Sequence, residues 1–286
     1  MRPAADVVIP FGGRSLGPVL TQAGQLSLRD GDTVTVVDNR ARPEDAAMVP
    51  VGVRLVAAPG VASSYFARNA GARAGSAPWI VFLDSDVLAP PDLLDRLLVP
   101  APDERVAVVG AEVEDEPPRP GDPPAVRYAH LKNAMGQAGN LRLGFVATAC
   151  CAVRREAFEA ADGFREDVRS GGDADLCFRL RAAGWEIALR PDVVVCHRSR
   201  RSIARMLAQR ARHGSGAAWM AREHPGSLPP RPLAGTAWWA ARRAAAGVAA
   251  LRRNDRDAAL TAFLDGPALL AYELGRRVVP NRAARR

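Results

Sequence analysis

The chain has 286 residues, of which 48% are hydrophobic and 24% are charged, and its formal net charge is +8. This length can bury a sizeable core, and the composition excludes an intrinsically disordered or a fibrous chain. The four cysteines show no CxxC spacing, and no charged start leads into a long apolar run of the kind that marks an export signal, so we expect a protein of the reducing cytosol.

Short apolar runs alternate with helix-like segments through the first half of the chain. The expected strands lie at residues 6–10, 33–39, 53–58 and 79–83, and the expected helices lie at residues 15–29 and 63–74, with Ser15 and Ser63 as caps. Strands separated by helices pair in parallel through right-handed crossovers, which predicts a layered α/β sheet. Ligands bind at the carboxyl ends of the strands in such sheets, where Pro10, Asp38 and Asp84 fall.

The second half begins with an acidic, proline-rich segment at residues 112–124, which we interpret as a surface loop between two lobes. We then expect a strand and a helix, a second helix ended by Gly184 and followed by a strand, and a separate last strand that ends at His197. Helices are expected at residues 202–222, 236–253 and 257–277. None is a bilayer span, because Arg242 and Arg243 interrupt the one apolar candidate.

The charge is unevenly distributed along the chain. Residues 198–286 hold 18 arginines and 5 acids, a net charge of +13, whereas the 197 residues before them carry −5. Nucleic acid or an anionic membrane surface could meet such a basic segment. No zinc finger, RNA-binding motif or aromatic-interleaved basic stripe accompanies it, so we favour peripheral contact with a membrane and expect no nucleic-acid partner.

The apolar run at residues 77–83 leads straight into Asp84, Ser85 and Asp86. Positions i and i+2 of a strand project to the same side, so both carboxylates can converge on one cation if the strand continues to its end. Magnesium and manganese suit such a site, because they keep waters and take further ligands from phosphates. The alternative is structural: Asp84 would cap the next helix, and Asp86 would be a solvated turn residue.

Four segments of the chain occur in an order and spacing typical of one enzyme family. They are VVIPFGG, VVDN, ARNAGARAGSAPWIVFLDSDV, and AVRREAFEAADGFRED together with GGDADLCFRLRAAGWEIALRPDVVVCH. From about residue 5 to about residue 200 the chain thereby resembles the family 2 glycosyltransferases of the GT-A fold. Residues 201–286 are more loosely similar to the extension of actinobacterial glycosyltransferases of the mycofactocin type.

The resemblance implies an α/β fold, with a mostly parallel layered sheet and helices on both faces. It further implies a catalytic domain at residues 1–200 and a basic helical extension at residues 201–286. Within the catalytic domain, residues 1–110 would bind the nucleotide and residues 125–200 the acceptor.

A donor site for a nucleotide-diphosphate sugar, most commonly a UDP-sugar, is implied as well. Its residues would be Pro10, Phe11, Gly12, Asp38, Arg68, Asn69, Asp84, Ser85 and Asp86. Asp38 would accept a hydrogen bond from the nucleobase, and Arg68 would offer its planar fork to the pyrophosphate or to Asp84. Alternatively, Asp38 is an ordinary turn residue and Arg68 lies on a helix surface.

The resemblance also implies a divalent cation, Mg²⁺ or Mn²⁺. Asp86 would be its main ligand and His197 a second one, and Asp84 would bind the ribose or support the metal through a water molecule. Neutral imidazole is a competent metal ligand, although a lone histidine at a strand end is otherwise a surface residue.

An inverting transfer needs a base for the acceptor hydroxyl and a Lewis acid for the departing phosphate. The family shows a pair of acids where this chain has Gly172 and Asp173. Asp173 is therefore the implied base, and the missing first acid leaves acceptor binding open. Asp173 could instead cap a helix, with Asp175 as the next candidate base. Gly171 and Gly172 would let this loop move as a lid.

The resemblance therefore implies an inverting, metal-dependent hexosyltransferase that acts on a hydroxyl of a small molecule, a peptide or a lipid-linked glycan. The alternative is a non-catalytic module that binds nucleotide sugars on the same fold. A sugar-phosphate nucleotidyltransferase is disfavoured, because residues 12–16 lack a full glycine-rich loop with a following lysine. A cytoplasmic location is expected, and the basic tail allows association with a membrane.

Overall fold

The computed structural model describes residues 2–43 and 49–286. Its contacts divide the chain into two compact units. Unit 1 comprises residues 1–113, 136–197 and 282–286, and unit 2 comprises residues 114–135 and 198–281. All the candidate site residues named above belong to unit 1. The domain boundary expected between residues 200 and 201 stays a prediction.

Unit 1 contains a mixed β-sheet, whose strand order in the described residues is β3-β2-β1-β4-β7-β6-β8-β5. Strands β1 (Ala5–Phe11), β2 (Thr33–Asp38), β3 (Val53–Ala57) and β4 (Trp79–Leu83) pair in parallel. The later strands are β5 (Val87–Leu88), β6 (Val106–Asp115), β7 (Cys150–Arg154) and β8 (Glu186–His197). Strand β7 is antiparallel to β4 and to β6, and β5 is antiparallel to β8. The predicted α/β sheet is confirmed, with its parallel part limited to β1–β4.

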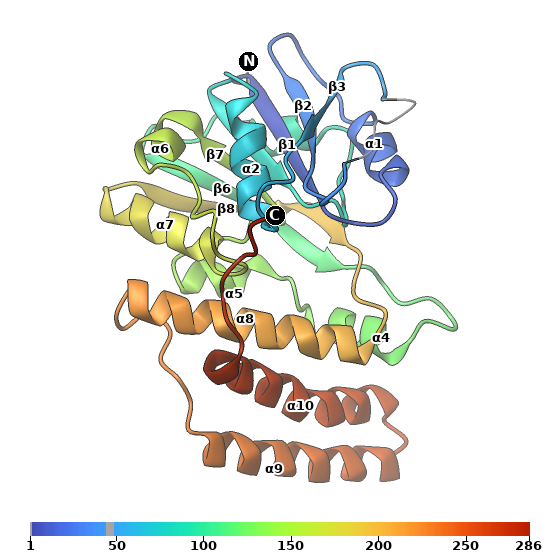
Figure 1. Cartoon of the computed structure of the whole chain (residues 1–286). Coiled ribbons are helices and arrows are strands. Elements are labelled where there is room, and N and C mark those ends of the chain that lie inside the picture. The colour runs from blue at the N-terminus through green and yellow to red at the C-terminus, as the bar shows by residue number, and fades with distance from the viewer. Residues whose placement is uncertain (1, 44–48) are drawn as a thin grey trace. The chain divides into compact units, whose positions relative to one another are not determined.

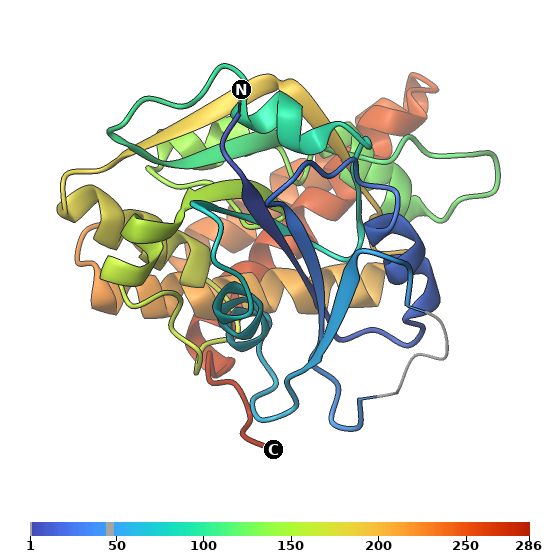
Figure 2. The ribbon, with the colours of Figure 1, turned by 90° about the horizontal axis from the view of Figure 1, so that it is seen from above.

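In the described residues of unit 1 the helices are α1 (Gly17–Ala23), α2 (Ser64–Arg73), α3 (Leu93–Leu98), α5 (Gln137–Arg142), α6 (Arg155–Ala160) and α7 (Gly172–Ala182). Helices α1 and α2 contact the parallel strands, α6 contacts β7, and α3, α5 and α7 contact β8. Figure 2 shows α1 and α2 on opposite sides of β1–β3. Helix α1 is shorter than expected, and Ser15 is not its cap, because the helix starts after Leu16 without a side-chain cap.

Helix α2 carries two of the candidate site residues and packs closely on β1 and β2. Its start is fixed by Ser63, whose side chain accepts a 3.2 Å hydrogen bond from the Tyr65 amide, as predicted. At Gly71 an added Cβ would lie 2.3 Å from Val8 Cγ1 and 2.9 Å from Val37 Cγ2. Only glycine therefore lets α2 approach the sheet this closely.

An aromatic cluster fixes the carboxyl end of β4. Phe82 of β4 packs with Phe158 and Phe164, with ring centroids 5.1 to 5.6 Å apart, and Tyr65 lies 5.4 Å from Phe164. Burying a side chain of this size stabilises the fold by about 1.5–3 kcal/mol. Because β4 is buried along its whole length, the position of Asp84 directly after it is well determined.

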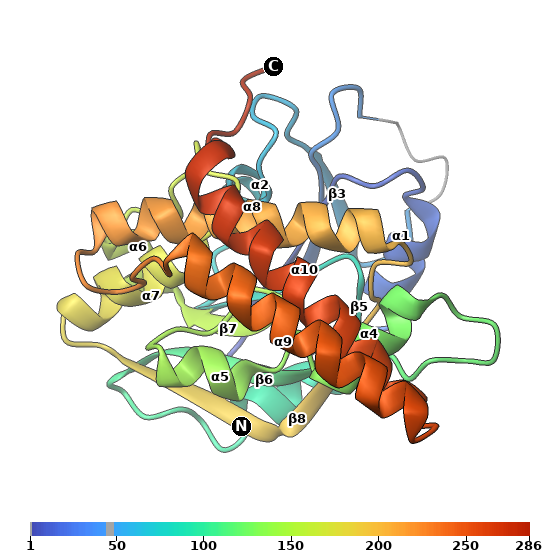
Figure 3. The same ribbon diagram turned by 90° about the horizontal axis from the view of Figure 1, so that it is seen from below.

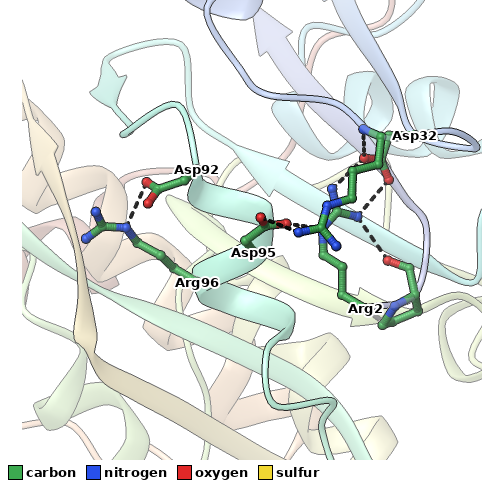
Figure 4. Close-up of polar contacts among 7 residues, drawn as sticks. Arg2, Asp32, Asp92, Asp95 and Arg96 are labelled. Carbon is green, nitrogen blue, oxygen red and sulfur yellow. Dashed lines mark hydrogen bonds and ion pairs between the residues drawn. The ribbon is translucent and has the colours of Figure 1, made fainter.

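An ion-pair network built on the buried Arg2–Asp32 pair fixes the amino ends of β1 and β2, and its third member, Asp95, is 39% exposed. Arg2 donates to both carboxylate oxygens of Asp32, at 2.9 and 2.5 Å, and to Asp95 at 2.5 Å (Figure 4). Burial alone would raise the pKa of Asp32, but hydrogen bonds from Arg2 and from the Arg29 and Ala5 amides hold that pKa below its usual value. The network therefore stabilises the amino ends of these strands, which are opposite to the strand ends that carry the candidate site.

Unit 2 is helical, with α4 (Pro124–Lys132), α8 (Ile203–Glu223), α9 (Leu233–Arg252) and α10 (Arg256–Val278). Helix α10 lies between α8 and α9 (Figure 1 and Figure 3). It approaches α8 so closely that a Cβ added at Gly214 or Gly275 would lie within about 2 Å of a backbone oxygen. The three helices predicted beyond residue 200 are confirmed. No helix in the described part of the chain is long and apolar enough to cross a bilayer.

The segment at residues 112–124 is not the loop that its composition predicts. Strand β6 continues to Asp115 and α4 begins at Pro124, so only residues 116–123 are irregular. The buried Asp115 carboxylate accepts a 2.6 Å hydrogen bond from the Ser199 hydroxyl. A strand tolerates a buried acid that is hydrogen-bonded in this way, which composition alone does not reveal.

The last two expected strands form one strand, β8, which runs through Pro191. Strand β5 pairs only with Cys196 and His197 of β8. Among the described residues, β5 is the strand on that side of β8, and it does not reach Pro191. A proline, which has no amide hydrogen to donate, is tolerated where no neighbouring strand pairs with it, so β8 continues through Pro191.

Candidate active site at the carboxyl ends of the strands

Asp84 and Asp86 lie in a turn and not in a strand. Strand β4 ends at Leu83, and the Val87 amide donates a 3.0 Å hydrogen bond to the Asp84 carbonyl oxygen, which closes the turn. The expectation that strand geometry aligns the two carboxylates is therefore wrong. Asp84 does not cap the next helix either, since α3 begins at Leu93. The turn leaves the Asp84 and Asp86 side chains 30% and 31% exposed, within reach of a ligand.

Arg68 forms an ion pair with Asp84. The Arg68 side chain is only 4% exposed and lies on the buried face of α2, so the alternative of a helix-surface residue is wrong. Its Nη2 donates to Asp84 Oδ1, while its Nε has no hydrogen-bond partner in the described part of the chain. Burial raises the pKa of Asp84, Arg68 opposes this rise, and Asp86 adds to it. A buried guanidinium is costly unless it is paired, so this pair constrains both residues.

His197 lies beside Asp86, because Val87 of β5 pairs directly with His197 at the end of β8. The distance from His197 Nε2 to Asp86 Oδ2 is 3.8 Å. His197 is 5% exposed, which excludes the alternative of an ordinary surface histidine. Among the described residues, no group of three or more histidine, cysteine or acidic side chains is arranged to hold a metal.

Asp38 is buried at the carboxyl end of β2 and forms an ion pair with Arg40. Arg40 donates to both Asp38 oxygens, at 2.9 and 2.7 Å, and its guanidinium lies 5.2 Å from the centre of the Phe11 ring. The sheet register places Pro10 and Phe11 directly beside the end of β2, and the exposed Gly12 follows them. Sequence reasoning missed Arg40, although its spacing of two residues from Asp38 was a signal.

Asn69 holds a neighbouring segment in place. Its side-chain nitrogen donates to the Phe164 carbonyl oxygen at 2.9 Å, and its side-chain oxygen accepts from the Phe164 amide at 3.0 Å. The side-chain nitrogen is also 3.0 Å from Glu166 Oε1. Asn69 thus connects α2 to the segment between α6 and α7, and its place in the donor site stays a prediction.

Asp173 lies in the first turn of α7 but does not cap the helix. The N-cap is Gly171, with a left-handed φ of 88° and no side-chain cap bond. Asp173 Oδ1 accepts hydrogen bonds from the Ala174 amide at 3.0 Å and from the Tyr65 hydroxyl at 3.3 Å. The other candidate base, Asp175, is buried and accepts a 2.9 Å hydrogen bond from Arg179. Asp173 is thus the more accessible of the two acids.

Residues 282–286, here called the strap, return to unit 1 and join three of its loops (Figure 1). Arg286 donates to the Asn39 carbonyl oxygen, next to Asp38. Sequence reasoning missed the strap, because no local pattern in an alanine- and arginine-rich segment specifies a distant backbone partner. Its backbone hydrogen bonds include Ala62 N to Ala284 O at 2.8 Å, Arg286 N to Gly60 O at 2.9 Å and Ala283 N to Asp167 O at 2.7 Å.

The sequence is similar to known glycosyltransferases. The family model described as "Glycosyltransferase like family 2" matches residues 28–216. The pre-mycofactocin glycosyltransferase of Mycobacterium tuberculosis is 30% identical over 221 residues, which are 74% of this chain and 47% of that protein. Glycosyltransferase AglE of Haloferax volcanii is 30% identical over 153 residues, which are 54% of this chain and 50% of that protein. The chain thus spans about half the length of the curated relatives it matches.

Three solved structures share the fold. A mannosyltransferase from Pyrobaculum calidifontis, in complex with GDP-Man and Mn²⁺, superposes with a TM-score of 0.61 at 20% identity, over 94% of this chain and 87% of that one. Glucosyl-3-phosphoglycerate synthase from Mycobacterium tuberculosis, in complex with phosphoglyceric acid, has a TM-score of 0.52 at 20% identity, over 77% and 79%. GalNAc-T7, with UDP, GalNAc and Mn²⁺, has a TM-score of 0.51 at 13% identity, over 70% and 44%. The expected GT-A fold is confirmed.

Deleting the strap should loosen the loop at residues 60–62 without unfolding unit 1. The Ala62 amide loses its acceptor, the Ala284 carbonyl oxygen, so its hydrogen exchange should accelerate about tenfold. Amide exchange measured by NMR on the parent and on the truncated chain tests this. The Ala58 amide, which donates to the Asp38 carbonyl oxygen at 2.8 Å, is the internal control and should exchange at the parent rate. An unchanged rate at Ala62 would contradict the assigned contact.

Proposed function

This chain belongs to glycosyltransferase family 2, and on that premise we propose that it moves a hexose from a nucleotide-diphosphate sugar to an acceptor hydroxyl, with inversion at the anomeric carbon. The observation that carries the proposal is a continuous set of side-chain contacts. Asp84 contacts Arg68, the Arg68 guanidinium lies 5.4 Å from the centre of the Tyr65 ring, and the Tyr65 hydroxyl contacts Asp173. These contacts connect Asp84, where we place the donor, with Asp173, the proposed base, in one site.

The proposed donor is a UDP-sugar, and GDP-sugars and dTDP-sugars are the next candidates. Asp38 accepts hydrogen bonds at the carboxyl end of β2, and an imide N–H of a nucleobase can take the place of part of the Arg40 pairing. The Arg68 Nε is a buried donor without a partner in the described residues. An unpaired buried donor is costly, so a phosphate oxygen that reaches it would be stabilised.

The arrangement of Asp86 and His197 fits a divalent cation. Two ligand atoms that each lie about 2.1 Å from one ion can be at most about 4.2 Å apart. Their separation of 3.8 Å is therefore compatible with one shared ion. Mg²⁺ or Mn²⁺ suits such a site, because these ions take their remaining ligands from water and phosphate. Asp84, already committed to Arg68, would bind the ribose or support the ion through a water molecule.

In the proposed reaction, Asp173 accepts the proton of the acceptor hydroxyl as that oxygen attacks the anomeric carbon from the face opposite the nucleotide. The glycosidic bond forms as the bond to the nucleoside diphosphate breaks. A bound cation would neutralise charge on the departing diphosphate. Arg68 holds Asp84 in place. Its guanidinium would also lie near the negative charge of the departing diphosphate. The acceptor is a hydroxyl of a small molecule, a peptide or a lipid-linked glycan, and Gly171 and Gly172 allow the loop before α7 to close over it.

We further propose that the enzyme works in the cytoplasm at an anionic membrane surface, which α9 contacts. Residues 224–254 contain five arginines and no acid. On α9, Trp238 is 62% exposed, with the Arg242 guanidinium 4.8 Å from its ring centre, and Val248 and Leu251 are exposed as well. An acid-free helix with exposed tryptophan, aliphatic and arginine side chains matches the chemistry of a headgroup region.

Asp173→Asn should reduce turnover by about 10² to 10⁴, as expected for loss of a general base, with donor affinity nearly unchanged. The donor for the assay is whichever of UDP-glucose, GDP-mannose and dTDP-glucose gives the largest thermal shift with Mn²⁺. Release of nucleoside diphosphate, with water as the acceptor, gives the rate. Asp175→Asn is the control on the same helix: it breaks the pair with Arg179 and should lower stability more than turnover. If Asp173→Asn turns over at the rate of the parent protein, Asp173 is not the base. If the parent protein binds the donor and never cleaves it, a non-catalytic module is favoured.

Asp86→Ala should remove the effect of Mn²⁺ on nucleotide affinity. In the parent, calorimetry should show UDP binding at least about tenfold more tightly with Mn²⁺ than with EDTA, because the ion links the protein to the diphosphate. Asp92→Ala is the control, since that half-exposed acid pairs only with Arg96 among the described residues, and it should retain the effect. Metal-independent UDP binding in the parent would count against the cation site.

The double variant Trp238→Ala/Arg242→Ala should bind anionic vesicles at least about fivefold more weakly than the parent. Sedimentation with phosphatidylglycerol-containing and with pure phosphatidylcholine vesicles measures this, and only the anionic vesicles should retain the parent. Arg105→Ala removes an exposed arginine of unit 1 and should bind like the parent. Equal binding of the double variant, or a parent that instead dimerises through this helix, would overturn the membrane assignment.

A further inference from the structure

We propose that Tyr65 is a positioning residue for the base. Its hydroxyl holds one carboxylate oxygen of Asp173, so that the other oxygen faces the acceptor. This inference rests on the proposed function, in which Asp173 accepts the acceptor proton. Tyr65 is not part of the sequence pattern that pointed to the site.

The contacts of Asp173 are all on one oxygen. Oδ1 accepts from the Tyr65 hydroxyl at 3.3 Å and from the Ala174 amide at 3.0 Å. Oδ2 makes no hydrogen bond within the described part of the chain. The carboxylate is thus held through Oδ1, and Oδ2 is the oxygen that can receive a proton.

The direction of the Tyr65 hydrogen bond is fixed. Burial raises the pKa of Tyr65 far above its usual value, and the negative charge of Asp173 adds to the rise. The phenol therefore keeps its proton at neutral pH and donates it to the carboxylate in a hydrogen bond.

Gly172 makes room for the Tyr65 ring. A Cβ added at residue 172 would lie 2.9 Å from two ring carbons of Tyr65 and 3.0 Å from a third. Any side chain at this position, including the acid expected from the family resemblance, would collide with the ring. The missing acid and the buried tyrosine are therefore one structural feature, in which a phenol hydroxyl occupies the neighbourhood of Asp173 in place of a second carboxylate.

The ring itself is held from two other sides. The Arg68 guanidinium lies 5.4 Å from its centre, and the Phe164 ring lies 5.4 Å from it at a tilt of 36°. These contacts involve the ring and not the hydroxyl. Replacing Tyr65 by phenylalanine therefore keeps the ring packing and removes the hydroxyl, together with its hydrogen bond to the Asp173 side chain and its backbone hydrogen-bond interactions with Gly172 and Asp173.

The test is Tyr65→Phe, assayed by nucleoside diphosphate release from the donor selected by thermal shift. We expect kcat to fall about tenfold with the donor KM nearly unchanged, because one hydrogen bond to a charged group is lost. Tyr128→Phe is the matched control: it removes a 2.9 Å tyrosine hydroxyl contact to Asp265 in unit 2 and should leave kcat and the donor KM unchanged.

A double-mutant cycle separates this inference from the function on which it rests. In an Asp173→Asn background, Tyr65→Phe should cause no further loss, because the residue it positions is already disabled. If Asp173→Asn abolishes turnover while Tyr65→Phe keeps the parent kcat, the positioning role of Tyr65 is wrong and the assignment of Asp173 as the base stands. If Asp173→Asn itself turns over normally, the proposed function fails first. Gly172→Ala is a second variant, which should displace the ring and reproduce the Tyr65→Phe phenotype.

Discussion

The buried ion pair between Arg68 and Asp84 is the constraint on which the rest of the site depends. A guanidinium that is almost fully buried must be paired, or its desolvation would destabilise the fold. Arg68 is on the buried face of α2, and Asp84 follows directly on β4, which is buried along its whole length. Their pairing therefore fixes the rotation of α2 about its axis, and that rotation decides which side chains of the helix face the carboxyl ends of the strands.

Three side chains of α2 act from one face, since residues 65, 68 and 69 are spaced i, i+3 and i+4. Tyr65 contacts Asp173, Arg68 contacts Asp84, and Asn69 holds the backbone of Phe164. These partners come from segments about 16 to 108 residues away in the sequence. A single helix face therefore connects the donor end of the proposed site with the base and with the loop that precedes α7. The close approach of α2 to the sheet at Gly71 makes these contacts possible.

The sequence predicted the parts of the fold that local pattern determines. The four parallel strands, the Ser63 cap and the C-terminal helices are confirmed, because hydrophobic periodicity and capping act over a few residues. Features that depend on distant partners were missed. Among them are the strand through Asp115 and the strap, which are set by tertiary contacts. The turn at Asp84 and the pairing of Arg40 with Asp38 are local and were missed as well. The absence of an acid at Gly172 was visible in the sequence, but its reason, the Tyr65 ring, is 107 residues away.

The most direct test of the account is a crystal structure of the full chain with Mn²⁺ and the nucleoside diphosphate that binds best. The account predicts an ion bound by Asp86 and His197, a diphosphate beside Arg68, and an Arg68–Asp84 contact that is kept as in the structure described above. A diphosphate bound elsewhere, or an Arg68 turned away from Asp84 with the nucleotide in place, would contradict the claim that this ion pair organises the site.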